Sequence, residues 1–477
     1  MTPQPPLRRA QAALLVAIAL ALTLLYFAGQ RRNPPGFYVD ESSVAYNAYT
    51  IATRGADEYG FRLPLYFRAF GEYKNPVLIY LLAGVFKLAG PGILTARRVS
   101  ALLGWLAALV MARLAWSQTR RRWIAMITFA TVLFTPMLFE ISRLAFEVAA
   151  FPLAVASFLW FAHRAATSER WPRSVIAGLA ISLACATYAY TAGRVLAPAF
   201  LLLLLVFVNR ARWKQFAAVV ALYALLALVP LAIYESRNPG ALGERARGTS
   251  YVTNWRADPI ATLVKLESQT LANLAPLGMS LRGDPNARHH VPHSGGSILG
   301  MTFVLALLGI RRDRLTLFLC LGALLSIAPG AATDDVFHTL RLAAYPLFLI
   351  ALSIVALQQR RLARAVLVLG VVQACFFLVV FERHGAERLG DFDDDARVVI
   401  TTAVRRPERP IYVHDAGSAY AHVYWYAALH GVEREAFRSY PAEGVPPPRS
   451  LVVAIGAPCA GCEVISRSGG YVAYLQR

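Results

Sequence analysis

The sequence predicts an α-helical polytopic membrane protein with about eleven transmembrane helices and a small α/β C-terminal domain outside the cytoplasm. Three observations lead to this fold class. Of the 477 residues, 57% are hydrophobic, and the mean hydropathy of +0.47 implies more apolar surface than a soluble domain keeps away from water. Apolar segments of nearly membrane-spanning length recur along the chain, separated by basic clusters. Beyond Phe381 these long apolar runs stop.

The apolar segments each approach the length needed to cross a hydrocarbon core. The predicted crossings are residues 10–29, 96–116, 123–139, 148–164, 174–190, 195–208, 215–234, 297–310, 315–329, 341–357 and 365–381. A further apolar segment, 76–90, is shorter, opens with Pro76 and carries Lys87 near its end. We expect it to lie along the outer membrane interface without crossing.

The basic residues then predict the orientation. Lys and Arg number 48 against 28 acids, a net charge of +20. They fall in short loops and not in one patch, which indicates membrane lipids as neighbours and argues against nucleic acid. With the N-terminus inside, every inner loop is basic; these loops are residues 120–122, 163–173, 209–214, 311–314 and 358–364. We therefore expect a multi-pass protein of the cytoplasmic (inner) membrane whose distinctive polar loops face outward, toward the periplasm.

The chain is expected to divide into a transmembrane domain, residues 1–381 with a first outer loop at 30–95, and a small extracytoplasmic domain, residues 382–477. Strand-like pieces at 410–414 and 450–455, a helical stretch at 420–430 and a strand pair at 462–467 and 470–475 predict the α/β character of the second domain. In an oxidising compartment a local disulfide between Cys459 and Cys462 is plausible.

The first outer loop carries the most distinctive charges. Asp40 and Glu41 follow the first apolar helix, and acids so close to a bilayer are costly unless something uses them. The alternative is that Asp40 caps a helix beginning near Glu41. Capping by Asp40 would not explain why an acid and a lysine, Glu72 and Lys74, follow in the segment Gly71-Glu72-Tyr73-Lys74-Asn75-Pro76.

Two other outer loops hold arginines at helix mouths. Arg143 lies between Glu140 and Glu147, and at helical spacing it would form a salt bridge with Glu147. Arg341 follows His338 at the start of an apolar helix, where an arginine pairs with phosphate or carboxylate or extends to lipid headgroups.

The fourth outer loop contains His289, His290 and His293, which invite a metal interpretation. Adjacent histidines in an extended segment point to opposite sides, so a polar turn with one functional histidine is the preferred interpretation. The sequence has no phosphate-binding loop, dinucleotide glycine pattern or serine nucleophile elbow, which argues against nucleotide chemistry.

These motifs carry a resemblance. The Asp40-Glu41 pair, the segment from Glu72 to Pro76, and Ser142-Arg143-Leu144 resemble GT-C glycosyltransferases of the family-39-like branch, which contains protein O-mannosyltransferases and lipid A aminoarabinose transferases. Segments 283–289 and 338–341 resemble bacterial members of that branch. The resemblance covers residues 1–381. It implies a hexosyl- or pentosyltransferase that moves a sugar from a polyprenyl-phosphate donor to a glycolipid, polysaccharide or protein acceptor on the outer face of the membrane.

The resemblance also implies residue roles, which the chemistry of the residues supports. The catalytic carboxylates are Asp40, Glu41 and Glu72, although the family's Glu-Lys-Pro-Pro motif is interrupted here. Sugar transfer needs a carboxylate for the acceptor and cations for the departing phosphate, and the candidate cations are Lys74, Arg143 and Arg341. Supporting residues are Glu147, His338 and Tyr73. No cofactor is implied with certainty, and a divalent metal held by Asp40 with Glu72 or Glu147 stays open.

Two other functions stay open. A lipid-linked-glycan transporter or flippase would show broken helices and buried charge pairs, whereas the predicted crossings carry almost no central charges. A non-catalytic envelope assembly subunit would share the fold without the activity.

Overall fold

A computed structural model of the chain describes residues 9–414, 419–440 and 444–477. Within it the chain forms two compact units. The first holds the chain up to Gly29, Asn75–Val77 and Ser100–His384. The second holds Gln30–Lys74, Leu78–Val99 and the chain from Gly385 onward. Most of the predicted first outer loop therefore belongs to the same unit as the C-terminal region.

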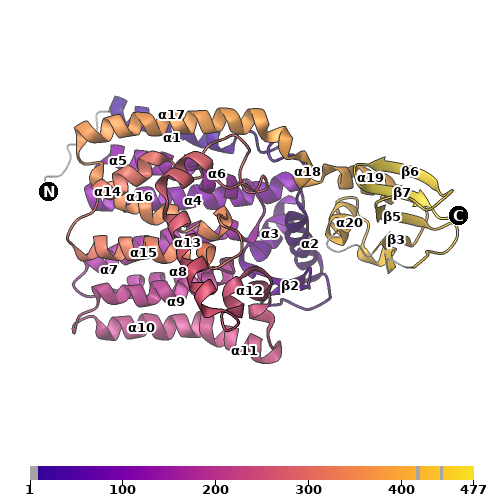
Figure 1. Ribbon diagram of the computed structural model, residues 1–477, viewed down its shortest axis with the longest axis horizontal. Helices are drawn as coiled ribbons and strands as arrows, with labels where there is room; N and C mark the ends of the chain where they lie inside the picture. Colours follow the sequence, from indigo (N-terminus) through magenta and orange to yellow (C-terminus); the bar gives the residue numbers. More distant parts are fainter. Residues whose placement is uncertain (1–8, 415–418, 441–443) are drawn as a thin grey trace. The chain divides into compact units, whose positions relative to one another are not determined.

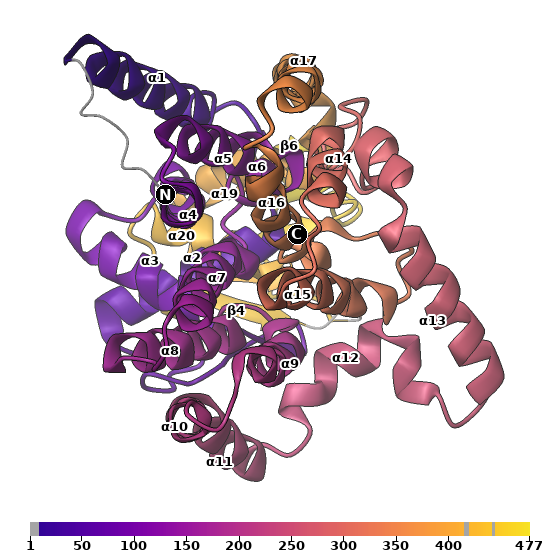
Figure 2. The same ribbon diagram turned by 90° about the vertical axis from the view of Figure 1, so that its left-hand side faces the viewer.

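The first unit is a bundle in which several helices run nearly parallel (Figures 1 and 2). The helix pairs α7 and α8, α8 and α9, α14 and α16, and α15 and α16 pack together. The helices of this unit are α1 Arg9–Phe27, most of α4 Ile93–Thr119, α5 Arg122–Phe134, α6 Pro136–Ile141, α7 Phe151–Thr167, α8 Arg173–Ala189, α9 Gly193–Leu203, α10 Trp213–Tyr223, α11 Val229–Arg237, α12 Glu244–Thr249, α13 Pro259–Leu274, α14 Gly300–Leu308, α15 Arg314–Ala331, α16 Tyr345–Ala356 and α17 Arg360–His384.

Six helical segments of the described residues are long and apolar enough to cross a membrane. They are Arg9–Phe27, Ile93–Thr119, Glu147–Thr167, Trp213–Arg237, Arg314–Ala331 and Ala365–Phe392. Each of the predicted crossings overlaps a helix. The helical polytopic architecture is therefore confirmed, and the number of eleven crossings stays a prediction.

One predicted crossing, 123–139, is interrupted. α5 ends at Phe134 and α6 begins at Pro136, and Thr135 between them is extended, with φ −66° and ψ 118°. Proline has no amide hydrogen and disfavours helical geometry in the residue before it. Pro136 is the signal in the sequence for this break, and the apolar residues on both sides of it favoured a single crossing in the prediction.

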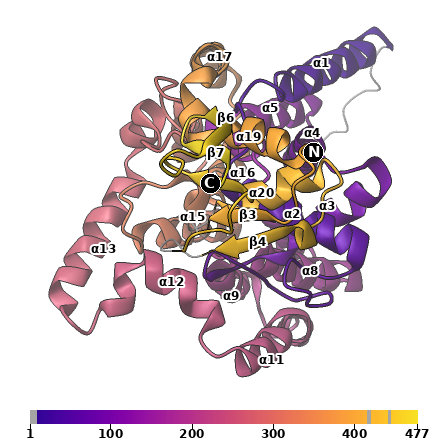
Figure 3. The same ribbon diagram turned by 90° about the vertical axis from the view of Figure 1, so that its right-hand side faces the viewer.

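The second unit contains a five-stranded sheet with the strand order β4-β3-β5-β7-β6 (Figure 3). β3 Ile411–His414 pairs in parallel with β4 Phe437–Tyr440 and β5 Leu451–Ile455, whereas β7 Tyr471–Leu475 runs antiparallel to β5 and β6 Glu463–Ser468. The small C-terminal sheet domain is confirmed. The edge strand β4 escaped prediction because only Phe437 of its four residues is buried.

Segments from both ends of the sequence share the core of this unit. Trp425 of α20 Tyr420–Ala428 is fully buried, with its ring centroid 5.7 Å from that of Phe37 and 5.9 Å from that of Phe86. Ser42 Oγ in α2 Val39–Arg54 lies 2.8 Å from His422 Nδ1. These contacts fix α2 against the C-terminal region.

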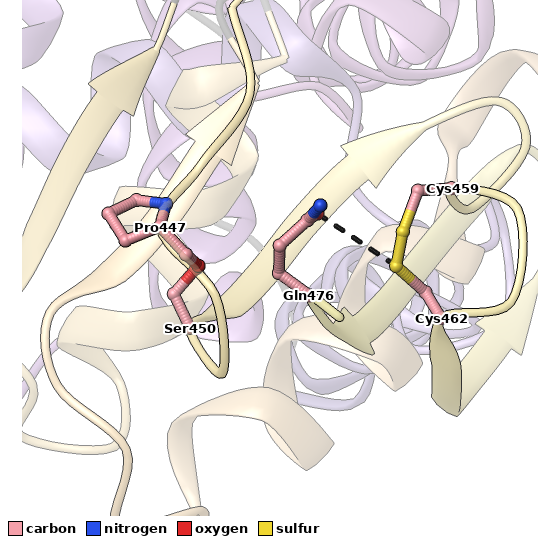
Figure 4. Close-up of a disulfide and its surroundings, with 5 residues drawn as sticks. All are labelled: Pro447, Ser450, Cys459, Cys462 and Gln476. Atoms are coloured by element: carbon pink, nitrogen blue, oxygen red, sulfur yellow. Dashed lines mark hydrogen bonds between the residues drawn. A yellow bond between two sulfur atoms is a disulfide. The ribbon is translucent and has the colours of Figure 1, made fainter.

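A disulfide joins Cys459 and Cys462, whose Cα atoms are 5.3 Å apart (Figure 4). It closes the short loop before β6, and the Gln476 side chain lies beside Cys462. The close-up therefore shows the disulfide that the C-x-x-C spacing suggested.

A short hairpin precedes α3 Pro76–Ala89. β1 Phe67–Ala69 pairs antiparallel with β2 Glu72–Lys74. The two turn residues, Phe70 and Gly71, have φ of 56° and 75°, the positive values that a tight two-residue hairpin requires. Because side chains alternate along a strand, the hairpin directs Glu72 and Lys74 to one face and Tyr73 to the other.

Candidate active site

Lys74 lies between two carboxylates in the second unit. Its ammonium contacts Asp40 Oδ1 and lies 3.4 Å from Glu72 Oε1. The Lys74 side chain is only 6% exposed, whereas the side chain of Asp40 is 34% exposed and that of Glu72 is 17% exposed. Lys74 Nζ also lies 5.0 Å from the centre of the Phe70 ring. The structure thus brings together three predicted site residues and leaves one carboxylate partly open to solvent.

The start of α2 explains why Asp40 is available for this contact. Tyr38 is the N-cap residue, and its amide donates to Glu41 Oε2 at 3.0 Å. The capping interaction therefore comes from Glu41, and Asp40 lies in the first turn, where the helix dipole favours a negative charge. The alternative that Asp40 is the cap is wrong.

Glu41 is fully buried in an ion pair with Arg97 of α4. Arg97 Nε donates to Glu41 Oε1 at 3.0 Å, and Arg97 Nη2 donates to Glu41 Oε2 at 2.8 Å. Arg97 also donates to the carbonyl oxygens of Pro34 and Gly36. Such a paired, hydrogen-bonded carboxylate is well suited to hold the loop in place.

The same contacts bear on the course of α3. Lys74, before α3, contacts Asp40, and Arg97, after α3, contacts Glu41. Because Asp40 and Glu41 are adjacent, the residues before and after α3 lie close to the same part of α2. A membrane-crossing α3 would separate Lys74 and Arg97 by roughly the 30 Å of a hydrocarbon core. The contacts fit an α3 that does not cross.

Glu147, in the first unit, binds the residue that follows Lys74. Its Oε2 accepts hydrogen bonds from the Asn75 amide nitrogen, at 2.9 Å, and from the Asn75 side chain. The Asn75 side chain also contacts Thr191 Oγ1 and accepts from Arg194. The helical spacing needed for an Arg143–Glu147 pair is absent, because α6 ends at Ile141 and Glu147 begins a separate 3-10 helix.

Arg143 has a different environment from the one predicted. It is buried, and its guanidinium donates to the carbonyl oxygens of Ala28, at 2.6 Å, and Tyr26. Its Cζ lies 4.2 Å from the centre of the Phe139 ring. Arg143 thus caps the C-terminal end of α1, and these contacts do not favour the predicted role in phosphate binding.

Arg341 and His338 occupy another loop of the first unit. Arg341 Nη1 donates to Asp335 Oδ2 and Thr333 Oγ1, both at 2.7 Å, and its side chain is 12% exposed. This is the carboxylate partner that the sequence allowed for. Burial lowers the pKa of His338 to about 2, together with the charges of His289 and Arg341, so that its imidazole is neutral at physiological pH.

The neighbouring histidines diverge, as expected for adjacent residues. His289 Nδ1 lies 3.2 Å from Asp284 Oδ2, whereas His290 Nδ1 lies 3.0 Å from Glu140 Oε1. Burial alone would raise the pKa of Asp284, but the His289 contact and amide hydrogen bonds hold it at about 2. No local motif predicts the His290–Glu140 contact, because its partners are 150 positions apart in the sequence.

Glu58 is a buried acid that the sequence interpretation missed. Its Oε1 accepts from Asn47 Nδ2 at 3.1 Å, and Arg434 donates to its carbonyl oxygen. Burial raises the pKa of Glu58 to about 7, against the opposing effect of the Asn47 hydrogen bond. In the sequence, Asp57-Glu58 looks like any pair of acids in a polar loop.

Comparisons with known proteins bear on the fold. Residues 73–234 match the sequence model of a family described as dolichyl-phosphate-mannose-protein mannosyltransferase. The structure of ArnT from Cupriavidus metallidurans bound to undecaprenyl phosphate is similar at a TM-score of 0.66 and 13% identity, covering 98% of this chain and 98% of that one. The Archaeoglobus fulgidus oligosaccharyltransferase in complex with Zn and sulfate is similar at a TM-score of 0.52 and 13% identity, covering 92% of this chain and 67% of that one. No curated protein matches by sequence. At this identity the structural likeness shows the fold.

Proposed function

We propose that this chain, which has the GT-C fold of membrane glycosyltransferases, transfers a hexose or pentose from a polyprenyl-phosphate-linked donor to an acceptor on the outer face of the cytoplasmic membrane. The observation that carries the proposal is the Asp40–Lys74–Glu72 cluster, in which a partly exposed carboxylate adjoins a buried cation. The matching family and the ArnT structure bound to undecaprenyl phosphate support a lipid-phosphate donor.

Each group of the cluster has a role in such a transfer. Asp40 accepts the proton of the acceptor hydroxyl while that oxygen forms a bond to the anomeric carbon of the sugar. The bond from that carbon to the phosphate oxygen breaks, and polyprenyl phosphate leaves with the electron pair. Lys74 moves part of its interaction from the carboxylates to the departing phosphate and stabilises the negative charge that develops there. Glu72 keeps Lys74 in position, and Arg341 stays a second candidate for phosphate recognition.

The cluster also bears on the predicted bridging metal. Lys74 lies where a cation shared by Asp40 and Glu72 would have to bind, and one Glu147 oxygen is occupied by Asn75. A lysine ammonium already balances the two carboxylates. We therefore propose that Lys74, and not a divalent metal, neutralises this pair.

Several observations support the orientation that we propose. A disulfide forms in an oxidising compartment, and the Cys459–Cys462 disulfide belongs to the same unit as Asp40. The basic loops of the predicted topology would face the cytoplasm. Together they favour a cluster that faces the periplasmic side of the inner membrane.

Deleting the gene in the source organism tests the activity. Mass spectrometry of lipid extracts should show a polyprenyl-phosphate sugar that accumulates without the protein and returns to its normal level when the wild-type gene is restored. Parallel analysis of glycolipids, envelope polysaccharides and protein glycans should identify the acceptor as the class that loses this sugar. Unchanged lipid-linked sugars and unchanged glycans would refute the proposal and favour a non-catalytic protein with the same fold.

A further inference from the structure

We propose that Asp284, His289 and His338 in the first unit form a binding site for a divalent transition metal ion, with Zn²⁺ the best chemical match. One potential ligand atom from each residue lies within 4.8 Å of the other two. The ligands come from two loops, one before α14 and one before α16. The site shares no residue with the Asp40–Lys74–Glu72 cluster.

The donor set is typical of such ions. Zn²⁺ binds imidazole nitrogen and carboxylate oxygen at about 2.0 to 2.2 Å, usually with tetrahedral geometry. Two ligand atoms at those distances lie roughly 3.3 Å apart. The separation of Asp284 Oδ2 and His289 Nδ1 is 3.2 Å, and the ring centroids of His289 and His338 are 4.4 Å apart. Modest side-chain rotation would place all three donors around one ion.

A second, independent observation points to a ligand at this cluster. His338 Nδ1 is buried and has no hydrogen-bond partner among the described residues. Buried polar atoms are nearly always paired, so a buried ring nitrogen without a partner needs an explanation. A hydrogen bond between Asp284 and His289 accounts for those two residues and leaves His338 Nδ1 unexplained. A metal ion that binds all three accounts for the whole cluster.

The surroundings hold the donors in place. Asp284 Oδ2 accepts from the Thr339 amide at 2.8 Å and from Thr339 Oγ1 at 2.9 Å, while Asp284 Oδ1 accepts from the Asn286 amide at 2.9 Å. Hydrogen bonds of this kind orient metal ligands in proteins. Because Thr339 follows His338, they also join the two ligand-bearing loops before any ion binds.

Metal analysis of the full-length, untagged protein in detergent tests the proposal. After treatment with a chelator and incubation with excess Zn²⁺, desalted wild-type protein should retain a single ion per chain by mass spectrometry of the metal. Asp284→Asn and His338→Gln should reduce retention to the level of the buffer blank. His430→Gln is the matched control, because His430 contacts Thr401 in the second unit, and it should retain zinc like the wild type.

A measurement on the wild type alone guards against variants that fail to fold. Co²⁺ in place of Zn²⁺ should give visible absorption bands of a site with nitrogen and oxygen ligands, and added Zn²⁺ should abolish them. Zinc should also raise the thermal midpoint of the wild type, because an ion that binds only the folded state stabilises it. Wild-type protein with no retained zinc, no cobalt bands and no thermal shift would overturn the assignment. None of these readouts depends on glycosyl transfer.

Discussion

Asp40 and Glu41 show how burial separates the roles of two adjacent carboxylates. Glu41 is fully buried, and Arg97 and the Tyr38 amide occupy both of its oxygens. The Asp40 side chain keeps about a third of its surface exposed beside Lys74. A group that takes a proton from an acceptor must be reachable by that acceptor. We therefore assign proton transfer to Asp40 and positioning to Glu41.

Asp40→Asn should abolish most activity without unfolding the protein. The substitution keeps the size of the side chain and removes its charge, and the capping contact of Glu41 is untouched. Turnover should fall by roughly a hundredfold or more, the usual loss for a general base, with membrane levels close to normal. Transfer of labelled sugar by purified protein measures this effect.

Asp391→Asn, which changes the same type of residue in α18 Leu389–Phe392 of the same unit, is the control and should keep wild-type turnover. Near-normal transfer to a hydroxyl acceptor by Asp40→Asn would mean that Asp40 has a structural role only.

Lys74 and Arg143 should differ when each is replaced by methionine. Lys74→Met should weaken binding of polyprenyl phosphate roughly ten- to a hundredfold, because a charge-assisted hydrogen bond contributes about 1.5 to 3 kcal/mol. Arg143→Met should lower the thermal midpoint, since it removes the donors to the Tyr26 and Ala28 carbonyls, and the folded fraction should bind the lipid normally. Native mass spectrometry with added lipid measures the lipid affinity, and thermal unfolding of each purified variant measures the midpoint. Equal lipid affinity in Lys74→Met and wild type would show that Lys74 does not bind the phosphate.

At the scale of elements, a short hairpin and one helix organise the candidate site. The turn at Phe70 and Gly71 sets the register in which Glu72 and Lys74 share a face. α3 then leads to α4, where Arg97 returns to the Glu41 carboxylate. Asp40 and Glu41 lie in the first turn of α2, and Arg97 lies near the start of α4. The charges are thus positioned by the hairpin and by the starts of two helices.

The ends of α4 provide a test of topology. Arg98 near its start and Arg120 just after its end are both exposed. In a variant without native cysteines, Arg98→Cys should react with a membrane-impermeant maleimide added to intact spheroplasts. Arg120→Cys should react only after the membrane is permeabilised. Labelling of Arg120→Cys alone in intact spheroplasts would invert the predicted orientation.

Apolar length and turn residues were enough to predict most elements. The helices of the first unit follow from composition, and four of the five strands of the C-terminal sheet follow from short apolar pieces between turn residues. The break at Thr135 had a local signal in Pro136, which the prediction did not use. Local pattern could not reveal β4, because that strand buries little apolar surface.

The contacts within the candidate site were less predictable than its residues. Asp40, Glu72 and Lys74 attract attention as charges near a membrane, and the structure joins them. The partner of Glu41 is 56 positions away, so no short motif contains it. Arg143 is a residue type that commonly binds phosphate, but in the structure its guanidinium donates to the backbone carbonyl oxygens at the end of α1. Burial and partner, which distant parts of the chain determine, decide between such roles.

At the scale of the whole molecule, Glu58 should make stability depend on pH. Its pKa is about 7 in the folded state, against an ordinary value of 4.5. Between pH 4.5 and pH 7 the folded state holds a proton on Glu58 that the unfolded chain has lost. The free energy of unfolding therefore falls as pH rises through this range, and the whole destabilisation by the Glu58 charge is present above pH 7. Glu58→Gln should therefore stabilise the protein at pH 8, by up to about 3 kcal/mol, and change little near pH 4.5.

Thermal midpoints at pH 5 and pH 8 measure this dependence. Glu463→Gln removes a carboxylate from the exposed start of β6 and should leave the pH dependence as in the wild type. If the thermal midpoint fell by the same amount from pH 5 to pH 8 in wild type and in Glu58→Gln, Glu58 would not be the cause of the pH dependence.

The second unit combines Gln30–Lys74 and Leu78–Val99 with the chain from Gly385 onward, and this affects the timing of biosynthesis. After Val99 leaves the ribosome, about 285 further residues must be made before Gly385 appears, which takes roughly 15 to 60 seconds at 5 to 20 residues per second. Throughout that interval Phe37 and Phe86 lack the Trp425 ring that covers them in the finished fold. The nascent protein would therefore display an aromatic surface to chaperones while its helices are already inserting, and a late stop codon would leave that surface permanently uncovered.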